Sequence, residues 1–305
     1  MLLPSSRTVA WPALALVFNA LVWGLSWWPF RQMQSHGLHP LWATVLVFAL
    51  CTIVITCWRP RAVQEVLRTP ALWVLVLAAG TTNAAFNWAV SIGDVVRVVL
   101  LFYLMPLWTV LLARWILGEP LTVRAALQVL LALTGAATVL WPQALPEAPW
   151  WQYLPLPRNL AEALGVLGGF TFALNNVMLR KEASRSEAAR GWAMFFGGVL
   201  VAGVLAALLT WLGTVSAPPS LSSAWMGYAL VLTLLFLASN MALQYGAARL
   251  PAHVTAVVML SEVVFASASA ALLGAGELTP RVLMGGGLIV AAALLATLSS
   301  SPQSA

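Results

Sequence analysis

One short motif occurs twice in this chain: the sequence reads GEPLTVR at residues 118–124 and GELTPR at residues 276–281. Each copy lies between two long apolar runs, and the second copy is one residue shorter than the first. Similarity of a chain to itself at a fixed distance indicates an internal repeat. We therefore expect two related halves, residues 1–145 and residues 146–305.

The composition of the chain places both halves in a membrane. Of 305 residues, 61% are hydrophobic and 8% are charged, and the mean hydropathy is +0.90. An ordinary soluble domain has roughly a quarter charged residues, so a soluble globular protein is excluded. Because a membrane-spanning helix needs about 20 apolar residues, the chain has room for nine or ten spans and for no separate soluble domain.

Apolar runs between charged, proline and glycine breaks predict ten membrane-spanning helices. The predicted spans are residues 10–30, 40–58, 71–90, 95–116, 122–141, 160–179, 190–213, 224–247, 252–274 and 280–299. The expected fold is therefore an all-α integral membrane protein with five helices in each half. Because five is odd, the second half enters the membrane from the opposite face, which gives two inverted repeats. Such repeats are typical of secondary transporters that bind substrate near the midplane and alternate access by rocking.

The positive charges predict the orientation of the chain. Eleven of the fifteen Lys and Arg residues fall on the side of the N-terminus and four on the other side. Cytoplasmic loops carry the excess of such residues, so both termini are expected in the cytoplasm. This topology accounts for most of the net charge of +6. The cations are scattered, with one short cluster at residues 180–190, and we expect no nucleic-acid partner.

Together these features resemble the drug/metabolite transporter superfamily and, within it, the EamA-type transporters. The resemblance rests on the five-plus-five helices, the WGLS segment at residues 23–26, Pro106 in the fourth span and the two Gly-Glu motifs. It implies a carrier of the bacterial inner membrane, often an exporter of amino acids or related metabolites. It also implies a central cavity lined mainly by the first, third, fourth, sixth, eighth and ninth helices. Val263 stands where the family often has proline, which leaves a kink of the ninth helix open.

Polar side chains inside the predicted spans are the first candidates for substrate binding, because an amide at membrane depth needs a partner. One arrangement of two amides and an aromatic residue recurs in both halves, 157 residues apart: Asn83, Asn87 and Trp88, then Asn240, Gln244 and Tyr245. Amides flanked by aromatic rings suit a zwitterionic or polar neutral solute. The alternative is that these side chains only join neighbouring helices.

Four single residues complete the candidate site. Glu262 is the one carboxylate well inside a predicted span, where it could pair with a substrate ammonium group, carry a proton or serve packing alone. Tyr103 lies near Pro106, which predicts a bend. Trp27 has an aromatic counterpart in the second half, and Asn176, next to Asn175, either lines the pathway or faces the cytoplasm.

The predicted function is that of a secondary transporter that exports small amphipathic metabolites, with amino acids as the expected class. Its partners would be this solute, the lipid bilayer and, if Glu262 carries a proton, protons. The alternatives are an intramembrane enzyme and a non-transporting membrane receptor. Three histidines without HExxH spacing, and two cysteines without a metal-site pattern, argue against an enzyme and a cofactor. Uniport, proton antiport and exchange all stay open.

Overall fold

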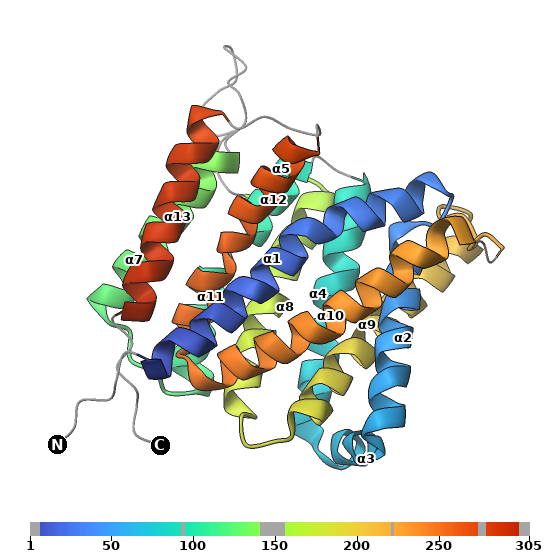
Figure 1. Cartoon of the computed structure of the whole chain (residues 1–305), viewed down its shortest axis with the longest axis horizontal. Coiled ribbons are helices and arrows are strands. Elements are labelled where there is room, and N and C mark those ends of the chain that lie inside the picture. The colour runs from blue at the N-terminus through green and yellow to red at the C-terminus, as the bar shows by residue number, and fades with distance from the viewer. Residues whose placement is uncertain (1–6, 93–94, 141–155, 221–222, 274–278, 299–305) are drawn as a thin grey trace.

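Helices follow one another in the order that the apolar runs predicted (Figure 1). The computed structural model describes residues 7–92, 95–140, 156–220, 223–273 and 279–298. The helices of the first half are α1 (Arg7–Ser35), α2 (Pro40–Trp58), α3 (Pro60–Arg68), α4 (Pro70–Ile92), α5 (Val95–Phe102), α6 (Met105–Ile116) and α7 (Val123–Leu140). Those of the second half are α8 (Leu160–Lys181), α9 (Glu187–Trp211), α10 (Ser223–Arg249), α11 (Ala252–Met259), α12 (Ser261–Leu272) and α13 (Pro280–Leu298). All regular structure in these residues is helical, which confirms an all-α fold.

Several of these helices are long enough to cross a membrane. Within the described ranges, seven candidate spans are found: α1, α2, α8, α9, α10, α11 with α12, and α13. The pair α3 and α4 adds an eighth candidate if it is counted as one span, although a bend of 104° separates the two helices. α6 and α7 are apolar but shorter. A multi-pass membrane protein is thus confirmed, whereas ten spans and the orientation of the termini stay predictions.

Local sequence explains where several helices begin. Proline occupies the first turn of α2, α3 and α6, where its missing N–H costs no hydrogen bond. Asn159 accepts the backbone N–H of Glu162 at the start of α8, at 2.9 Å. Ser186 accepts the N–H of Ala189 at the start of α9, at 3.2 Å. These side chains satisfy donors that a helix N-terminus otherwise leaves free.

The helices of the first half pack mainly against helices of the second half. α1 runs along α10 and α12, α4 lies against α8 and α9, α2 packs on α9, and α7 pairs with α13 (Figure 1). α8 also contacts α5 and α6, and α1 also contacts α11. The largest apolar core includes Met33, Phe48, Leu75, Phe236 and Met259. The two halves therefore form one bundle with a shared interior.

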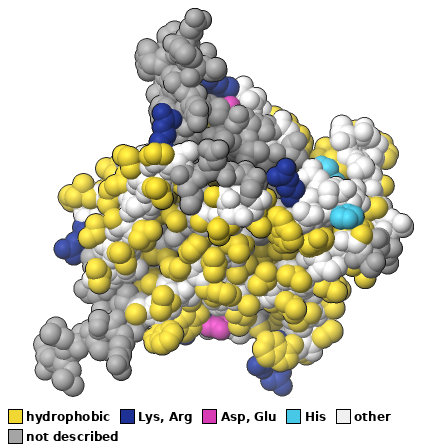
Figure 2. Space-filling view, turned by 45° about the horizontal axis from the view of Figure 1, so that its top comes forward, with side chains coloured by type: hydrophobic (Ala, Val, Ile, Leu, Met, Phe, Trp, Pro, Cys, Tyr) yellow, Lys and Arg dark blue, Asp and Glu magenta, His cyan; other side chains and the backbone are white. Residues whose placement is uncertain are grey.

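The outer surface of the bundle suits a lipid environment. Figure 2 shows a broad band of hydrophobic side chains across one face, with Lys and Arg side chains mostly toward its margins. Large apolar side chains such as Trp115, Trp211 and Leu272 are about four-fifths exposed or more. Such a surface would be unfavourable in water and is favourable against lipid chains.

Candidate functional site

The fourth predicted span is broken near its middle. α5 ends at Phe102 and α6 begins at Met105, with Tyr103 and Leu104 in the turn between them. Pro106 has no backbone N–H and cannot continue the helical hydrogen-bond ladder. The break lies directly before this proline, where the sequence predicted a bend.

The ninth predicted span is broken as well. α11 ends at Met259 and α12 begins at Ser261. The N–H of Leu260 donates to the carbonyl of Val257 at 3.2 Å, and the N–H of Val263 donates to the carbonyl of Leu260 at 3.1 Å. These bonds span three residues instead of the four of an α-helix, so the helix tightens locally. Residues Ala252–Leu272 still run as one candidate span, so this tightening at Leu260 is local, and it forms without a proline.

Glu262 lies directly after this second break, in the first turn of α12. A helix N-terminus favours a carboxylate at this position. The Glu262 side chain is partly buried, and its carboxylate makes no hydrogen bond or ion pair within the described part of the chain. Tyr103 of the first break lies within electrostatic range of this carboxylate. Tyr103 and Glu262 thus interact electrostatically inside the bundle, without a hydrogen bond between them in the described residues.

A glycine on α1 lets this region pack closely. A Cβ atom added at Gly24 would lie 2.9 Å from the carbonyl oxygen of Glu262 and 2.8 Å from the Cβ of Phe265. The backbone of α1 therefore lies directly against the start of α12. Trp27, one turn further along α1, donates its Nε1 hydrogen to the Ser269 hydroxyl at 3.0 Å, and Ser269 donates to the Gly24 carbonyl at 3.2 Å. Trp27 thus joins α1 to α12 about two helical turns beyond Glu262.

Buried polar atoms without partners lie between the break in α11–α12 and the C-terminal end of α8. Asn175 and Asn176 are each 1% exposed, and neither the oxygen nor the nitrogen of either amide has a hydrogen-bond partner. The Thr255 hydroxyl on α11 and the Trp108 Nε1 on α6 are likewise buried and unpaired. An unpaired buried polar group costs roughly 1–3 kcal/mol. Water or a polar solute is the natural partner for such groups.

The helices α6, α8 and α11, which carry the unpaired groups, meet in one apolar cluster. Trp108 and Ala252 pack in the same cluster as Ala173 and Val177 of α8. Asn175 and Asn176 lie between those two α8 residues in sequence, and Thr255 is one turn beyond Ala252. Thr255 and Trp108 were missed from the sequence because each is a single polar residue in an apolar run, with no pattern to mark it.

The two amides on α4 that the sequence predicted as substrate-binding residues form hydrogen bonds with groups on helices. Asn83 donates its Nδ2 hydrogen to the carbonyl of Ala79 in its own helix, at 2.8 Å. Asn87 donates to the hydroxyl of Thr44 on α2. Trp88 packs on an apolar cluster that joins α2, α4 and α9. Asn87 and Trp88 therefore contribute to contacts between helices, whereas the hydrogen bond of Asn83 stays within α4.

The corresponding amides on α10 face α9. Asn240 and Gln244 direct their side-chain nitrogens at the sulfur of Met194, at 3.3 and 3.1 Å. The Gln244 side chain is fully buried and its Oε1 has no partner. The two sets of amides thus lie on different helix interfaces and form no common cluster.

Tyr245 lies at the outside of the bundle. The Arg249 guanidinium stacks over its ring at 3.9 Å, which is a cation–π contact. Tyr245 also lines a groove of about 440 Å³ between α1 and α10, together with Trp11, Leu14, Ala15 and Phe18. This groove is open, and neither Tyr103 nor Glu262 lines it.

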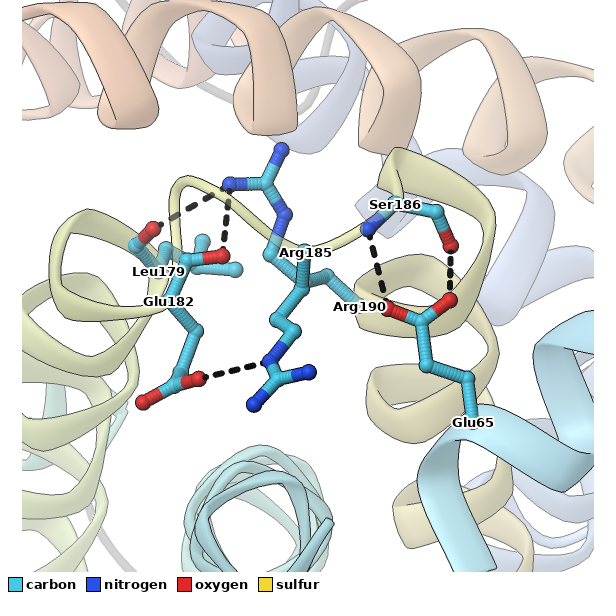
Figure 3. Close-up of polar contacts among 6 residues, drawn as sticks. All are labelled: Glu65, Leu179, Glu182, Arg185, Ser186 and Arg190. Carbon is cyan, nitrogen blue, oxygen red and sulfur yellow. Dashed lines mark hydrogen bonds and ion pairs between the residues drawn. The ribbon is translucent and has the colours of Figure 1, made fainter. Parts of the chain in front are cut away.

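Charged and polar groups form a network at the end of the bundle where α3 lies and α8 ends, which we call the α3 end (Figure 3). Buried Arg190 donates to the carbonyls of Leu179 and Glu182, at 3.3 and 3.4 Å, and so caps the C-terminus of α8. Glu65 on α3 accepts the backbone N–H of Ser186 at 3.1 Å and its hydroxyl at 2.6 Å. These contacts join α3, α8 and α9.

The first Gly-Glu motif contributes a contact between the two halves. One carboxylate oxygen of Glu119 accepts the N–H of Ala252 at 3.4 Å, and the other lies 3.9 Å from Nδ1 of His253. Glu119 therefore caps the start of α11 across the boundary between the halves. Its counterpart, Glu277, lies outside the described residues. No group of His, Cys, Asp and Glu that could hold a metal ion is found in the residues that the structure describes.

This geometry defines a helical membrane protein in which two broken spans approach each other inside the bundle. Its family follows from sequence: the sequence model of the EamA-like transporter family matches residues 10–141. A crystal structure of another protein is 18% identical to this chain, with a TM-score of 0.74, and the alignment covers 94% of this chain and 96% of the other. No curated protein sequence matches the chain.

Residues 10–141 are thus similar to the EamA-like transporter family, which is part of the drug/metabolite transporter superfamily. The resemblance predicted from the sequence is thereby confirmed. Members of this family are membrane transporters, which suggests a membrane transporter for this chain as well. The similar crystal structure shows that the fold extends over nearly the whole chain.

Proposed function

We propose that the protein is a secondary transporter that exports a small amphipathic solute, with amino acids as the expected class, across the bacterial inner membrane. The observation that carries this proposal is the packing of α6, which follows the break after Tyr103, against α11, which precedes Glu262. Broken helices in transporters commonly form the substrate or ion site, because their free backbone ends and side chains face a cavity.

The helix packing supports two inverted repeats at residues 1–145 and 146–305. α1 contacts α10, α11 and α12, and α8 contacts α4, α5 and α6. If α8 corresponds to α1, and if α10, α11 and α12 correspond to α4, α5 and α6, each of these contacts has its counterpart. When the two halves are exchanged, α2 takes the place of α9 and α7 takes the place of α13, so the contacts between α2 and α9 and between α7 and α13 are each mapped onto themselves. Such an arrangement permits alternating access by rocking of the halves.

The unpaired groups suit a zwitterionic solute. The free carboxylate of Glu262 can accept hydrogen bonds from an ammonium group, and the Tyr103 hydroxyl can donate or accept beside it. The amides of Asn176 and Asn175 can bind a carboxylate through nitrogen or an N–H through oxygen. They lie between Glu262 and the α3 end, which we propose is the cytoplasmic end, with both termini in the cytoplasm.

The other predicted residues remain candidates for the pathway, with a second role at helix contacts. Trp27 holds α1 to α12 about two helical turns beyond Glu262. The amides on α4 and α10 hold their helices to α2 and α9. These bonds lie within one half each and hold the helices of that half in place, so Asn87, Asn240 and Gln244 can affect flux without touching the solute.

The test is solute counterflow in proteoliposomes with a panel of labelled amino acids and related metabolites, with and without a pH gradient. Wild type is compared with Glu262→Gln and with a control, Glu187→Gln, whose carboxylate is at the surface near Arg249. We expect saturable counterflow for wild type and for the control. If Glu262→Gln loses only the flux driven by the pH gradient, Glu262 carries a proton. If this variant also loses counterflow, Glu262 binds the solute. Absence of flux for every solute, from folded protein, would contradict the proposal.

A further inference from the structure

α3 lies across the end of the bundle and does not continue a span. It is nine residues long, and its axis makes an angle of 104° with that of α4. Pro60 and Pro70 stand at the first positions of α3 and α4, so each helix begins anew after a short break. A short helix roughly perpendicular to the spans lies in the plane of the membrane surface.

The two faces of α3 differ in character. Ala62 and Val66 are buried against the bundle. The outward face carries Arg61, Leu67 and Arg68, all exposed, and Leu67 is 60% exposed. Trp58 and Arg59, which precede the helix, are exposed as well, and the Arg59 guanidinium lies 5.0 Å from the centre of the Trp58 ring. We call Arg59, Arg61 and Arg68, with Trp58 and Leu67, the α3 surface.

The single carboxylate of α3 does not neutralise this surface. Glu65 has both oxygens engaged by the N–H and hydroxyl of Ser186, toward α9 (Figure 3). Arg59, Arg61 and Arg68 form no ion pair with any residue that the structure describes. The surface therefore presents three guanidinium groups without an ion pair, and it stays net positive with the charge of Glu65 counted.

Apolar side chains continue from this surface along α2. Ile53 and Val54 are 56% and 44% exposed, and they precede Trp58, which is 67% exposed. Tryptophan is favoured at the boundary between lipid chains and headgroups. The cations are thus held at the depth where lipid phosphates lie, with apolar contacts directly beside them.

We propose that the α3 surface binds the headgroups of anionic phospholipids in the adjacent leaflet. Guanidinium groups form strong, paired hydrogen bonds with phosphate oxygens, and each cation near an anionic leaflet strengthens binding by roughly fivefold. Trp58 and Leu67 contact the upper part of the acyl chains. A free phosphate ion would use the cations alone, whereas a lipid uses both parts of the surface.

The chain offers its own labelling site for the test. Cys57 is exposed next to Trp58, whereas Cys51 is buried. A fluorophore on Cys57 is placed in phosphatidylcholine vesicles that contain a small fraction of spin-labelled phosphatidylglycerol or spin-labelled phosphatidylcholine, and quenching by the two lipids is compared. A Cys57→Ser protein gives the background labelling.

We expect labelled phosphatidylglycerol to quench severalfold more strongly than labelled phosphatidylcholine. The combined variant Arg59→Gln, Arg61→Gln and Arg68→Gln should lose this preference, and the corresponding Arg→Lys variant should keep most of it. The control Arg31→Gln changes an exposed arginine near the C-terminal end of α1, outside the α3 surface. This control should have no effect on the lipid preference. The preference should also fall as salt rises, because the screening length shrinks from about 10 Å at 0.1 M to about 3 Å at 1 M.

Three results would overturn the proposal. The first is equal quenching by both lipids in the wild type, and the second is a preference that the glutamine variant retains. The third is loss of the preference on addition of inorganic phosphate but not of chloride at the same ionic strength, which would assign the surface to a free anion. If the glutamine variant does not fold, a preference that is insensitive to salt overturns the proposal equally. None of these readouts depends on transport.

Discussion

Replacing Asn176 with leucine distinguishes two roles for this residue: an amide that binds the solute and an amide that only holds helices together. Both polar atoms of the Asn176 side chain are buried and unpaired within the described structure, and each such atom costs roughly 1–3 kcal/mol if it stays dry. Removing both should therefore leave the free energy of unfolding unchanged, if water pairs with them, or raise it by about 2–6 kcal/mol if they stay dry. Transport should be lost in either case, because the solute loses a partner.

Asn19→Leu is the matched control. Asn19 is buried to the same extent, but its Nδ2 donates to the carbonyl and the hydroxyl of Ser239, at 2.9 and 2.6 Å. This substitution leaves buried acceptors unpaired and should lower the free energy of unfolding by roughly 1–3 kcal/mol. Unfolding in mixed micelles, followed by circular dichroism, gives the stabilities, and counterflow gives the flux. A loss of stability for Asn176→Leu as large as that for Asn19→Leu would refute the reasoning.

Gly24→Ala should lower the melting temperature, because the new methyl group would meet the backbone of α12 at 2.9 Å and overpacking costs typically 1–3 kcal/mol; Gly227→Ala, with nothing within 4 Å, is the neutral control in the same thermal assay. Arg190→Met should cost roughly 1.5–3 kcal/mol of stability because it removes charged hydrogen bonds from the end of α8, whereas exposed Arg185→Met should change stability by less than about 0.5 kcal/mol; equal effects would contradict the capping role. Burial lowers the pKa of His39 below its ordinary value of 6.5. The neutral ring therefore stabilises the fold fully above pH 6.5, and this contribution is lost as the pH falls through the lowered pKa of the folded state. His39→Asn, measured by thermal unfolding against pH, should remove this dependence, and an unchanged profile would count against it.

The fold was largely predictable because its signals are periodic or repeated. Apolar runs of about 20 residues and the two Gly-Glu motifs predicted the helices and their order. The break at Pro106 followed from one residue type. The break at Leu260 did not, because it depends on tertiary packing of α12 and no proline marks it. α3 was taken for a connecting segment, since nine residues with several arginines resemble a loop more than a helix.

The candidate site was only partly predictable. Glu262 stood out because a carboxylate is rare inside a span, and Tyr103 because of the neighbouring bend. The spacing of the amides on α4 and α10 places two side chains on one face of each helix. It does not show which neighbouring helix packs against that face. Asn240 and Gln244 face Met194 of α9, a partner more than 40 residues away that no local pattern reveals.

The packing of first-half helices on second-half helices bears on how the polypeptide is assembled. α1, α2, α4 and α7 each find their main neighbour in the other half, and Glu119 completes the start of α11. Neither half has an interior of its own, so each corresponds to one subunit of an obligate heterodimer joined into a single chain. We expect two fragments, cut between α7 and α8 and produced together, to associate into a functional transporter, whereas either fragment produced alone should be degraded.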